Sequence, residues 1–139
     1  MRISIVTSCL LVLLPLFVLA QPEPVKILFD VTSDDSLVHQ TAVRHVELMA
    51  AAYPQSQFEV VIYGKAISMA LKDKSTVTKT VQKLADNPNV SFKVCEATMK
   101  RYNVDRSKLL PSMATVPDAI MEIVLKQGEG WGYIKEAHD

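Results

Sequence analysis

Cysteine is scarce in this sequence, with two residues among 139. Cys9 lies in an apolar N-terminal run, so Cys95 is the only cysteine in the rest of the chain. If that run is removed on export, no internal disulfide can form. The remaining thiol is then buried and inert, paired between chains, or reactive.

An excess of either charge is also missing. The chain has 15 Lys and Arg residues against 15 Asp and Glu residues, for a formal net charge of zero. Nucleic-acid affinity comes largely from basic groups that neutralise phosphates. We therefore expect no nucleic-acid partner and interpret basic pairs such as Lys72 and Lys74 as solvated.

Motifs for a P-loop, a serine triad or a zinc cluster are not found. The glycines at 128, 130 and 132 follow a predicted helix and precede a predicted strand, which reverses the dinucleotide-binding order and predicts helix termination. His39 and His45 lie on different faces of one predicted helix at about 100° per residue. We expect no cofactor and no metal site, and we interpret these histidines and His138 as solvated or capping.

The N-terminus has the features of a secretory signal peptide. Arg2 precedes an apolar run over residues 3–20, and Val18 and Ala20 occupy the small-residue positions of a cleavage site. We expect residues 1–20 to be removed and the protein to be periplasmic or secreted, without membrane contact afterwards. The alternative is an uncleaved membrane anchor, because about 18 apolar residues just span a bilayer. Pro15 and the cleavage site favour removal.

The remaining chain is long enough for one hydrophobic core. Residues 21–24 are predicted to be an extended linker, and residues 25–139 one domain. Strands are predicted over residues 25–31, 58–63, 90–94 and 131–134. Helices are predicted over residues 37–53, 75–85, 96–102 and 117–127, with Ser75 and Pro117 at two of their starts; residues 65–71 give no clear pattern.

Strands that alternate with helices at this spacing predict an α/β fold. We expect a single-domain, three-layer sandwich, with a mostly parallel sheet covered by helices on both faces. Ligands bind beyond the carboxyl ends of such strands. Asp30 ends the first strand and would face the same crevice as Cys95 if their strands are neighbours. Helix capping explains Asp34 and Asp35.

Cys95 lies at the end of the third predicted strand, immediately before a helix. The unpaired N–H groups and the dipole of that helix favour a thiolate, which is the nucleophilic form. Glu96 opposes this, because a second negative charge beside it is unfavourable. The alternative is that Cys95 is a small buried residue that fills the end of the strand.

Several short features recur in a fixed order from Val90 to Lys135. They are Cys95 with Thr98, Leu110-Pro111, Val116-Pro117, Gln127 with Gly130, and the aromatic strand from Trp131 to Ile134. Together with the opening VKILFDVTSDD, this order resembles the DsrE/DsrF-like (YchN-like) sulfur-relay family. The resemblance implies a flavodoxin-like topology and a trimer or hexamer.

The resemblance also implies a reaction. In sulfurtransferase members the strand-end cysteine accepts sulfur as a persulfide and passes it on, which would make Cys95 the reacting group and Thr98 a supporting hydroxyl. The partner would be a protein sulfur donor or acceptor of unknown identity. Export departs from the cytoplasmic members and leaves donor and acceptor open. Two alternatives are a non-catalytic oligomeric binding module with a structural Cys95 and a redox role through an intermolecular disulfide.

Overall fold

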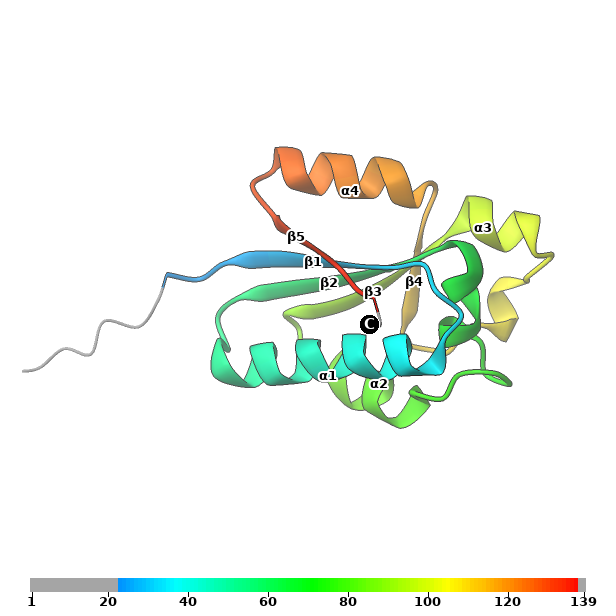
Figure 1. The fold of residues 1–139 in the computed structure, drawn as a ribbon, viewed down its shortest axis with the longest axis horizontal. Coiled ribbons are helices and arrows are strands. Elements are labelled where there is room, and N and C mark those ends of the chain that lie inside the picture. Colours follow the sequence, from blue (N-terminus) through cyan, green and yellow to red (C-terminus); the bar gives the residue numbers. More distant parts are fainter. Residues whose placement is uncertain (1–22, 138–139) are drawn as a thin grey trace, which may run out of the picture.

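A computed structural model describes residues 23–137 of the chain (Figure 1). It contains five strands, four α-helices and two short 3-10 helices. The elements in chain order are β1 (Lys26–Val31), α1 (Ser36–Ala52), β2 (Gln57–Ile62), η1 (Gly64–Ala70), α2 (Thr78–Ala85), β3 (Val90–Cys95), α3 (Glu96–Arg101), η2 (Arg106–Lys108), β4 (Met113–Val116), α4 (Ala119–Gly128) and β5 (Gly132–Lys135).

The strands form one sheet in the order β4-β3-β2-β1-β5, and every neighbouring pair is parallel. The chain therefore steps outward from β1 to β4 and then returns to place β5 at the free edge of β1. This confirms the predicted α/β class, and the described sheet is parallel throughout where we expected a mostly parallel one.

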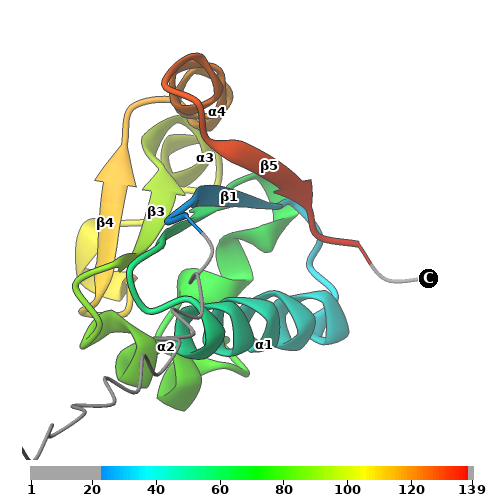
Figure 2. The same cartoon turned by 90° about the vertical axis from the view of Figure 1, so that its left-hand side faces the viewer.

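The helices make the outer two layers of the sandwich. Helices α1 and α2 cover one face of the sheet, and α4 crosses the opposite face (Figures 1 and 2). The connection before β3 thus runs over the α1 face, whereas the connection after β4 runs over the α4 face. Ligand crevices in open α/β sheets form beyond the carboxyl ends of strands where connections change face. The ends of β3 and β4 meet this description.

The main hydrophobic core lies between the sheet and helices α1 and α2. Successive residues of a strand point to opposite faces, so alternate positions of β1, β2 and β3 fill this core. Its largest fully buried side chains are Phe29, Phe58 and Phe92. Helix α1 adds Val38, Ala42 and Val46, which recur at the spacing of one helical face.

A second, smaller core lies under α4. It consists of Leu28, Val61, Cys95, Ala119, Ile123 and Trp131. The outward face of α4 is also apolar, and its exposed side chains are Ile120, Met121, Val124 and Leu125. Helix α4 therefore has apolar residues on more than the side that packs against the sheet.

Some predicted boundaries were wrong. Strand β4 was not predicted, because its four residues lie between Pro111 and Pro117 and were interpreted as loop. Helix α4 begins at Ala119 with Asp118 as its N-cap, so Pro117 precedes the cap. Helix α2 begins at Thr78, and Ser75 instead accepts a hydrogen bond from the Val77 N–H at 3.3 Å. The unclear segment after β2 is the 3-10 helix η1.

The N-terminal predictions fall mostly outside the described residues. Residues 1–22, with the expected signal peptide and the start of the linker, are not described, and neither is His138. The described chain starts at Glu23, and the Val25 N–H donates to Ser56 Oγ at 3.1 Å. Within residues 23–137, no helix combines the length and hydropathy needed to cross a membrane.

Candidate active site

Cys95 is the last residue of β3, and its side chain points to the α4 face of the sheet. It is 4% exposed. Its Sγ accepts a hydrogen bond from the Ala119 N–H at 3.4 Å, and Ala119 is the first residue of α4. We expected the helix after Cys95 to supply such a group. Cys95 does precede α3 directly, but its side chain makes no capping bond there, because it turns towards the start of α4.

A cavity of about 180 Å³ borders Cys95. Its walls come from the ends of β2 and β3, from α3 and from the start of α4: Tyr63, Cys95, Ala97, Thr98, Arg101, Asp118, Ala119 and Ile120. A water molecule in the liquid occupies about 30 Å³, so the cavity has room for a group of a few heavy atoms beside the sulfur. The two residues predicted from the resemblance, Cys95 and Thr98, both line it.

Thr98 is held by the turn that follows β2. Its Oγ1 accepts a hydrogen bond from the Gly64 N–H at 3.1 Å. Gly64 has a φ of 61°, in the left-handed region that glycine adopts without strain. Because a hydroxyl both accepts and donates, Thr98 keeps its hydrogen for another acceptor. The sequence places Thr98 near Cys95, and the turn at Gly64 fixes the side chain.

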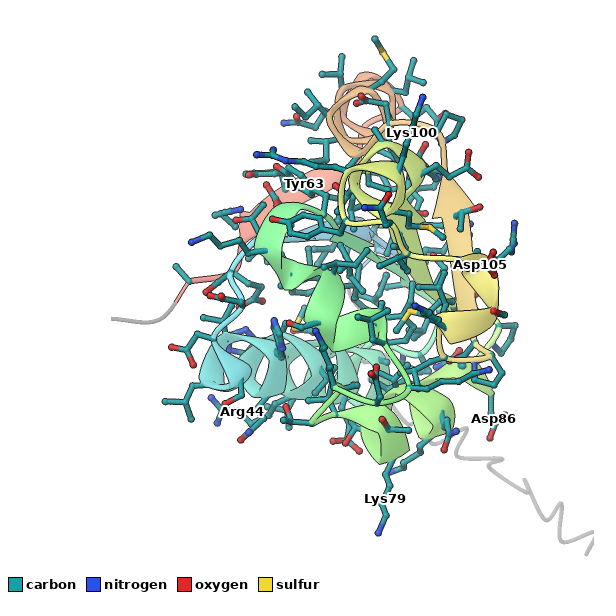
Figure 3. All side chains as sticks on the ribbon, turned by 90° about the vertical axis from the view of Figure 1, so that its right-hand side faces the viewer. Arg44, Tyr63, Lys79, Asp86, Lys100 and Asp105 are labelled. Atoms are coloured by element: carbon teal, nitrogen blue, oxygen red, sulfur yellow. The ribbon has the colours of Figure 1, made fainter. Side chains whose placement is uncertain are left out.

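Tyr63 connects the cavity to a buried carboxylate. It lines the cavity and packs against the small core that contains Cys95. Its hydroxyl donates to Asp30 Oδ2 at 3.3 Å. Tyr133 donates to the same oxygen at 2.6 Å, and Lys135 Nζ contacts Asp30 Oδ1 at 2.9 Å. Figure 3 views the molecule from the side of the carboxyl ends of the strands and labels Tyr63.

Both tyrosines are held in the protonated form. Burial, the Asp30 carboxylate and Cys95 together raise the pKa of Tyr63 to about 12. The hydrogen bond to Asp30, followed by burial, raises the pKa of Tyr133 to about 12 as well. At neutral pH each is therefore a hydrogen-bond donor. We did not predict Tyr63, although its place between a buried strand and Gly64 is a usable signal.

The charges around the cavity are mixed. Arg101 supplies a guanidinium on one wall, and the N-terminus of α4 adds the positive end of a helix dipole. Asp118, whose side chain accepts from the Met121 N–H, adds a carboxylate to the same lining. Glu96, which we expected to oppose ionisation of the thiol, accepts from Thr115 Oγ1 at 2.6 Å and does not line the cavity.

The acidic residues of β1 and of the loop after it do not line the Cys95 cavity. Strands β1 and β3 are not neighbours, because β2 lies between them. Asp30 accordingly contacts the Cys95 cavity only through Tyr63. Asp35 caps α1 by accepting from the Leu37 N–H at 2.8 Å, as predicted, and Asp34 is exposed.

The two described histidines make unrelated contacts. His39 is buried rather than solvated, and its Nε2 lies 2.7 Å from the Ser33 carbonyl oxygen in the loop before α1. His45 Nδ1 lies 2.9 Å from the Glu136 carboxylate. Among residues 23–137, no three or more His, Cys, Asp or Glu side chains are grouped as metal ligands.

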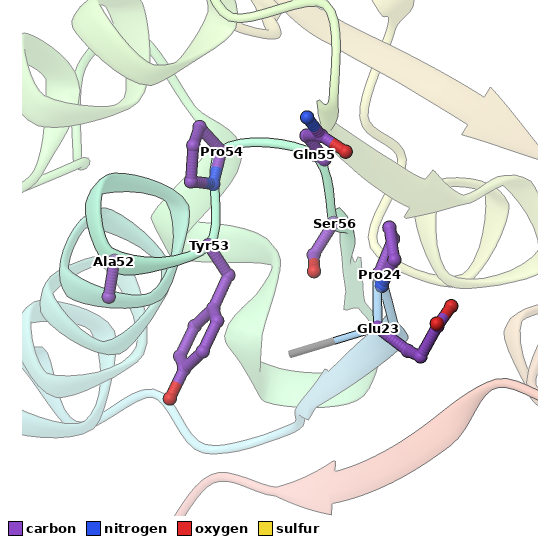
Figure 4. A pocket seen from close by; sticks show the side chains of 7 residues that line it. All are labelled: Glu23, Pro24, Ala52, Tyr53, Pro54, Gln55 and Ser56. Atoms are coloured by element: carbon purple, nitrogen blue, oxygen red, sulfur yellow. The ribbon is translucent and has the colours of Figure 1, made fainter. Parts of the chain in front are cut away.

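A larger cavity, of about 260 Å³, lies away from Cys95. Figure 4 shows its lining: Glu23, Pro24, Ala52, Tyr53, Pro54, Gln55 and Ser56. It joins the start of the described chain to the loop between α1 and β2. None of these residues is a cysteine, whereas the cavity at Cys95 is lined by the cysteine of the described chain, so the latter is the candidate site for thiol chemistry.

Comparison with known proteins agrees with the resemblance in the sequence. A family model described as the DsrE/DsrF-like family matches residues 26–135. The chain belongs to the DsrE/DsrF-like family. The matched region includes every strand and all residues that line the Cys95 cavity. A search among curated proteins finds no match.

Two solved structures share the fold of this DsrE/DsrF-like protein. The protein of unknown function MTH1491 from Methanobacterium thermoautotrophicum is 26% identical, with a TM-score of 0.75, covering 80% of this chain and 98% of its own. The ychN protein from E. coli is 10% identical, with a TM-score of 0.66, covering 81% and 97% respectively. The second likeness concerns the fold alone.

Proposed function

We propose that this DsrE/DsrF-like protein carries sulfur as a persulfide on Cys95. The observation that carries the proposal is the position of Sγ, which borders a cavity and accepts the N–H at the start of α4. Membership of a family with sulfur-relay proteins supports the same reaction. The donor and acceptor are sulfur-carrying proteins or small persulfides.

The reaction is a thiol–disulfide type of exchange. The Cys95 thiolate attacks the outer sulfur of a donor persulfide, R–S–S⁻, and a new S–S bond forms at Sγ. The S–S bond of the donor breaks, and its electron pair leaves on R–S⁻. Cys95 then holds one additional sulfur as Cys95–S–S⁻, and no external oxidant or reductant is consumed. The thiolate is the required form of the nucleophile.

A backbone N–H and a helix dipole that can stabilise an anionic sulfur lie beside Sγ, and the Asp118 carboxylate in the same lining opposes them. The Ala119 N–H and the N-terminus of α4 are preorganised to interact with an anionic sulfur. Arg101 adds a cation to the lining of the cavity. The cavity, of about 180 Å³, provides room for one added sulfur atom.

Intact mass spectrometry tests this proposal directly. Protein incubated with glutathione persulfide and then desalted is expected to gain the mass of one sulfur atom and to lose it on reduction. Cys95→Ser is the control and is expected to gain nothing. A wild-type chain that gains no sulfur, or a Cys95→Ser chain that gains the same mass, contradicts the proposal.

The two alternative roles of Cys95 give different results in simple assays. A structural cysteine would resist alkylation in the folded protein, although Cys95→Ala would assemble normally. A redox role would give a disulfide-linked dimer on non-reducing electrophoresis. The persulfide carrier instead predicts alkylation of the folded protein and a monomeric band.

A second candidate property is self-association through α4, which we propose with a second copy of the chain as the partner. Ile120, Met121, Val124 and Leu125 are between 55% and 63% exposed and form one apolar surface on this helix. Ile120 also lines the Cys95 cavity, so this surface continues into the candidate site. Covering it would remove apolar area from water.

Sedimentation velocity tests the self-association. Val124→Glu is expected to shift the wild-type oligomer to monomer, because a charge would be buried in an apolar contact. Leu48→Glu is the matched control, since Leu48 is 58% exposed on α1 and away from this surface. A monomeric wild type, or equal effects of both variants, contradicts the proposal.

Export is a third proposal, which depends on residues outside the described chain. Removal of residues 1–20 would leave a protein whose single cysteine is Cys95. The mass of the protein recovered from cells would place its N-terminus at Gln21 if cleavage occurs, and at Met1 if the segment is retained as an anchor.

A further inference from the structure

Two tyrosine hydroxyls share one oxygen of Asp30, but they differ in strength and in surroundings. Tyr133 makes the short bond to Oδ2, at 2.6 Å, and does not line the Cys95 cavity. Tyr63 makes the long bond to the same oxygen, at 3.3 Å, and does line the cavity. The weaker donor is therefore the one beside the reactive sulfur.

We propose that Tyr63 is a catalytic residue whose hydroxyl donates a hydrogen bond to the sulfur that leaves when Cys95 attacks, and that Asp30 positions it. This inference rests on the proposed function. The resting hydroxyl points to Asp30, and during the reaction it exchanges this long bond for one to the developing thiolate. A developing thiolate accepts a stronger hydrogen bond than the neutral sulfur of the intact S–S bond, so this interaction strengthens as the bond breaks.

Asp30 tolerates this exchange because it has other partners. Its Oδ1 contacts Lys135 Nζ at 2.9 Å, and its Oδ2 keeps the Tyr133 hydroxyl. Lys135 is itself fixed by Thr32 Oγ1 at 2.6 Å. A buried carboxylate that lost its only partner would carry a large desolvation cost. Asp30 would still have two partners, Lys135 and Tyr133, so releasing the Tyr63 hydroxyl costs little free energy. The hydroxyl can return to Asp30 after the reaction.

Tyr63 donates a hydrogen bond and keeps its proton. The pKa of Tyr63 is raised to about 12, whereas an ordinary thiol has a pKa of about 8.5. Transfer of the phenolic proton to the leaving thiolate would therefore be unfavourable. The leaving group departs as R–S⁻ with its electron pair and is stabilised by the hydrogen bond during S–S cleavage. No proton enters or leaves the balance of the step.

The test compares Tyr63→Phe with Tyr133→Phe in the full chain. Each variant deletes one hydroxyl bonded to the same oxygen, but only Tyr63 lines the cavity. Single-turnover attack of Cys95 on a series of small aryl disulfides is followed by the absorbance of the released thiolate. We expect Tyr63→Phe to slow the reaction roughly 10- to 100-fold, because the transition state loses one charge-assisted hydrogen bond. The deficit should grow as the leaving thiol becomes more basic.

Tyr133→Phe is expected to lower the reaction rate less, by a factor that does not depend on the leaving group. Asp30→Asn is the second variant, and it should reproduce the leaving-group dependence of Tyr63→Phe at reduced size, because it misplaces the hydroxyl without deleting it. Thermal melting of each variant separates these effects from loss of fold. Equal rates for Tyr63→Phe and wild type, or equal deficits for the two tyrosine variants at every leaving group, overturn the inference.

The disulfide series keeps this inference separate from the proposed function. Its reactions balance without a persulfide: Cys95–S⁻ and Ar–S–S–Ar give Cys95–S–S–Ar and Ar–S⁻. A wild type that attacks disulfides with the expected dependence on Tyr63, but gains no sulfur from persulfide donors, would refute the sulfur carrier alone. A wild type that gains sulfur normally, together with an unimpaired Tyr63→Phe, would refute the tyrosine alone.

Discussion

The two faces of the sheet are built from alternate residues of the same strands, yet they differ in content. The face under α1 and α2 holds the continuous apolar core, including Phe29, Phe58 and Phe92. The face under α4 holds a core of six residues, one of which is Cys95. Asp30 and Glu59 point to this second face, because they pair in register with Val61 and Leu28 of its core. One face therefore supplies stability, and the other has room for buried polar chemistry.

The polar groups on the α4 face also differ between its two ends. At the carboxyl ends of the strands, both oxygens of Asp30 are bonded. Near the amino ends, Glu59 Oε2 contacts Ser91 Oγ at 3.3 Å and Lys126 Nζ at 3.5 Å. Among the described residues, Glu59 Oε1 has no hydrogen-bond partner. The end near Cys95 is thus the better organised of the two.

The largest effect we predict comes from the apolar core under α1. Phe92→Ala should lower the free energy of unfolding by about 3–5 kcal/mol, because it removes a fully buried ring and leaves a cavity. That is a large share of the roughly 5–15 kcal/mol of a typical domain. Urea unfolding followed by circular dichroism measures it.

The core change on the other face is Ile123→Ala, which removes a smaller side chain from the small core under α4. Ile123 is 8% exposed and lies at the edge of a thinner layer, so its site can relax towards solvent. We expect a loss near the lower end of about 2–5 kcal/mol. An equal or larger loss than that of Phe92→Ala would show that the two faces contribute alike to stability.

A smaller effect is predicted at Glu59, which is buried on the α4 face. Lys126 lies 3.5 Å from Glu59 and 3.8 Å from Glu122, so one ammonium is shared by two carboxylates. Glu59→Gln would leave one ion pair, Lys126 with Glu122, and remove a desolvated charge. We expect the variant to be more stable than wild type at neutral pH, because a buried amide carries a smaller desolvation cost than a buried carboxylate.

The pH dependence of this difference has a definite sign. Burial is the main cause that raises the pKa of Glu59 above its ordinary value of 4.5, and Lys126 partly opposes it. Because the folded-state pKa is raised, protonated Glu59 contributes its full stabilisation below pH 4.5. This stabilisation is lost as the pH rises through the folded-state pKa. The two proteins should therefore differ least in acid and increasingly towards neutral pH. Urea midpoints across pH 4–8 that run parallel would contradict this.

The smallest effects are predicted for two helix caps, one on each face. Asp35 accepts from the Leu37 N–H at 2.8 Å to cap α1, and Asp118 accepts from the Met121 N–H at 2.9 Å to cap α4. Replacing either by Ala should cost about 1 kcal/mol, within the usual range for an N-cap. Thermal or urea unfolding would show similar losses for both.

The two cap variants should differ in their effect on the cysteine. Asp118→Ala loosens the turn that holds the Ala119 N–H against Cys95 Sγ, so it should change the rate of Cys95 alkylation. Asp35→Ala lies on the far face and should leave that rate as in wild type. The rate of alkylation of each variant by a neutral reagent is measured by mass spectrometry. Equal rates for the two variants would contradict the role of α4 in positioning the Ala119 N–H against Cys95.

Much of the fold followed from patterns of neighbouring residues. The runs VKILFDV and FEVVIY are apolar at nearly every position, as expected for strands covered on both sides, and both formed parallel strands. Strand β4 was missed, because MATV is short and lies between two prolines. Its pairing with β3 stabilises it, and such pairing is non-local and cannot be found from a local pattern.

In the candidate site, too, some residues could be predicted from local sequence and others could not. Cys95 and Thr98 could be predicted, because the strand end and the next turn of chain are local features. Tyr63, Asp30 and Lys135 could not be grouped, since they lie at the end of β2, on β1 and on β5 respectively, far apart in the sequence. The N–H that reaches Sγ was expected from α3 and comes from α4.

The sequence by itself determined the α/β class, the family and the cysteine at a strand end, because each depends on residues close together along the chain. The tertiary structure alone decided which helix faces the sulfur and which hydroxyls surround it. The reason is that strand order sets the neighbours of a parallel strand end. Placing β5 beside β1 brings Lys135 and Tyr133 to Asp30, and the return of the chain through α4 brings a backbone N–H to Cys95.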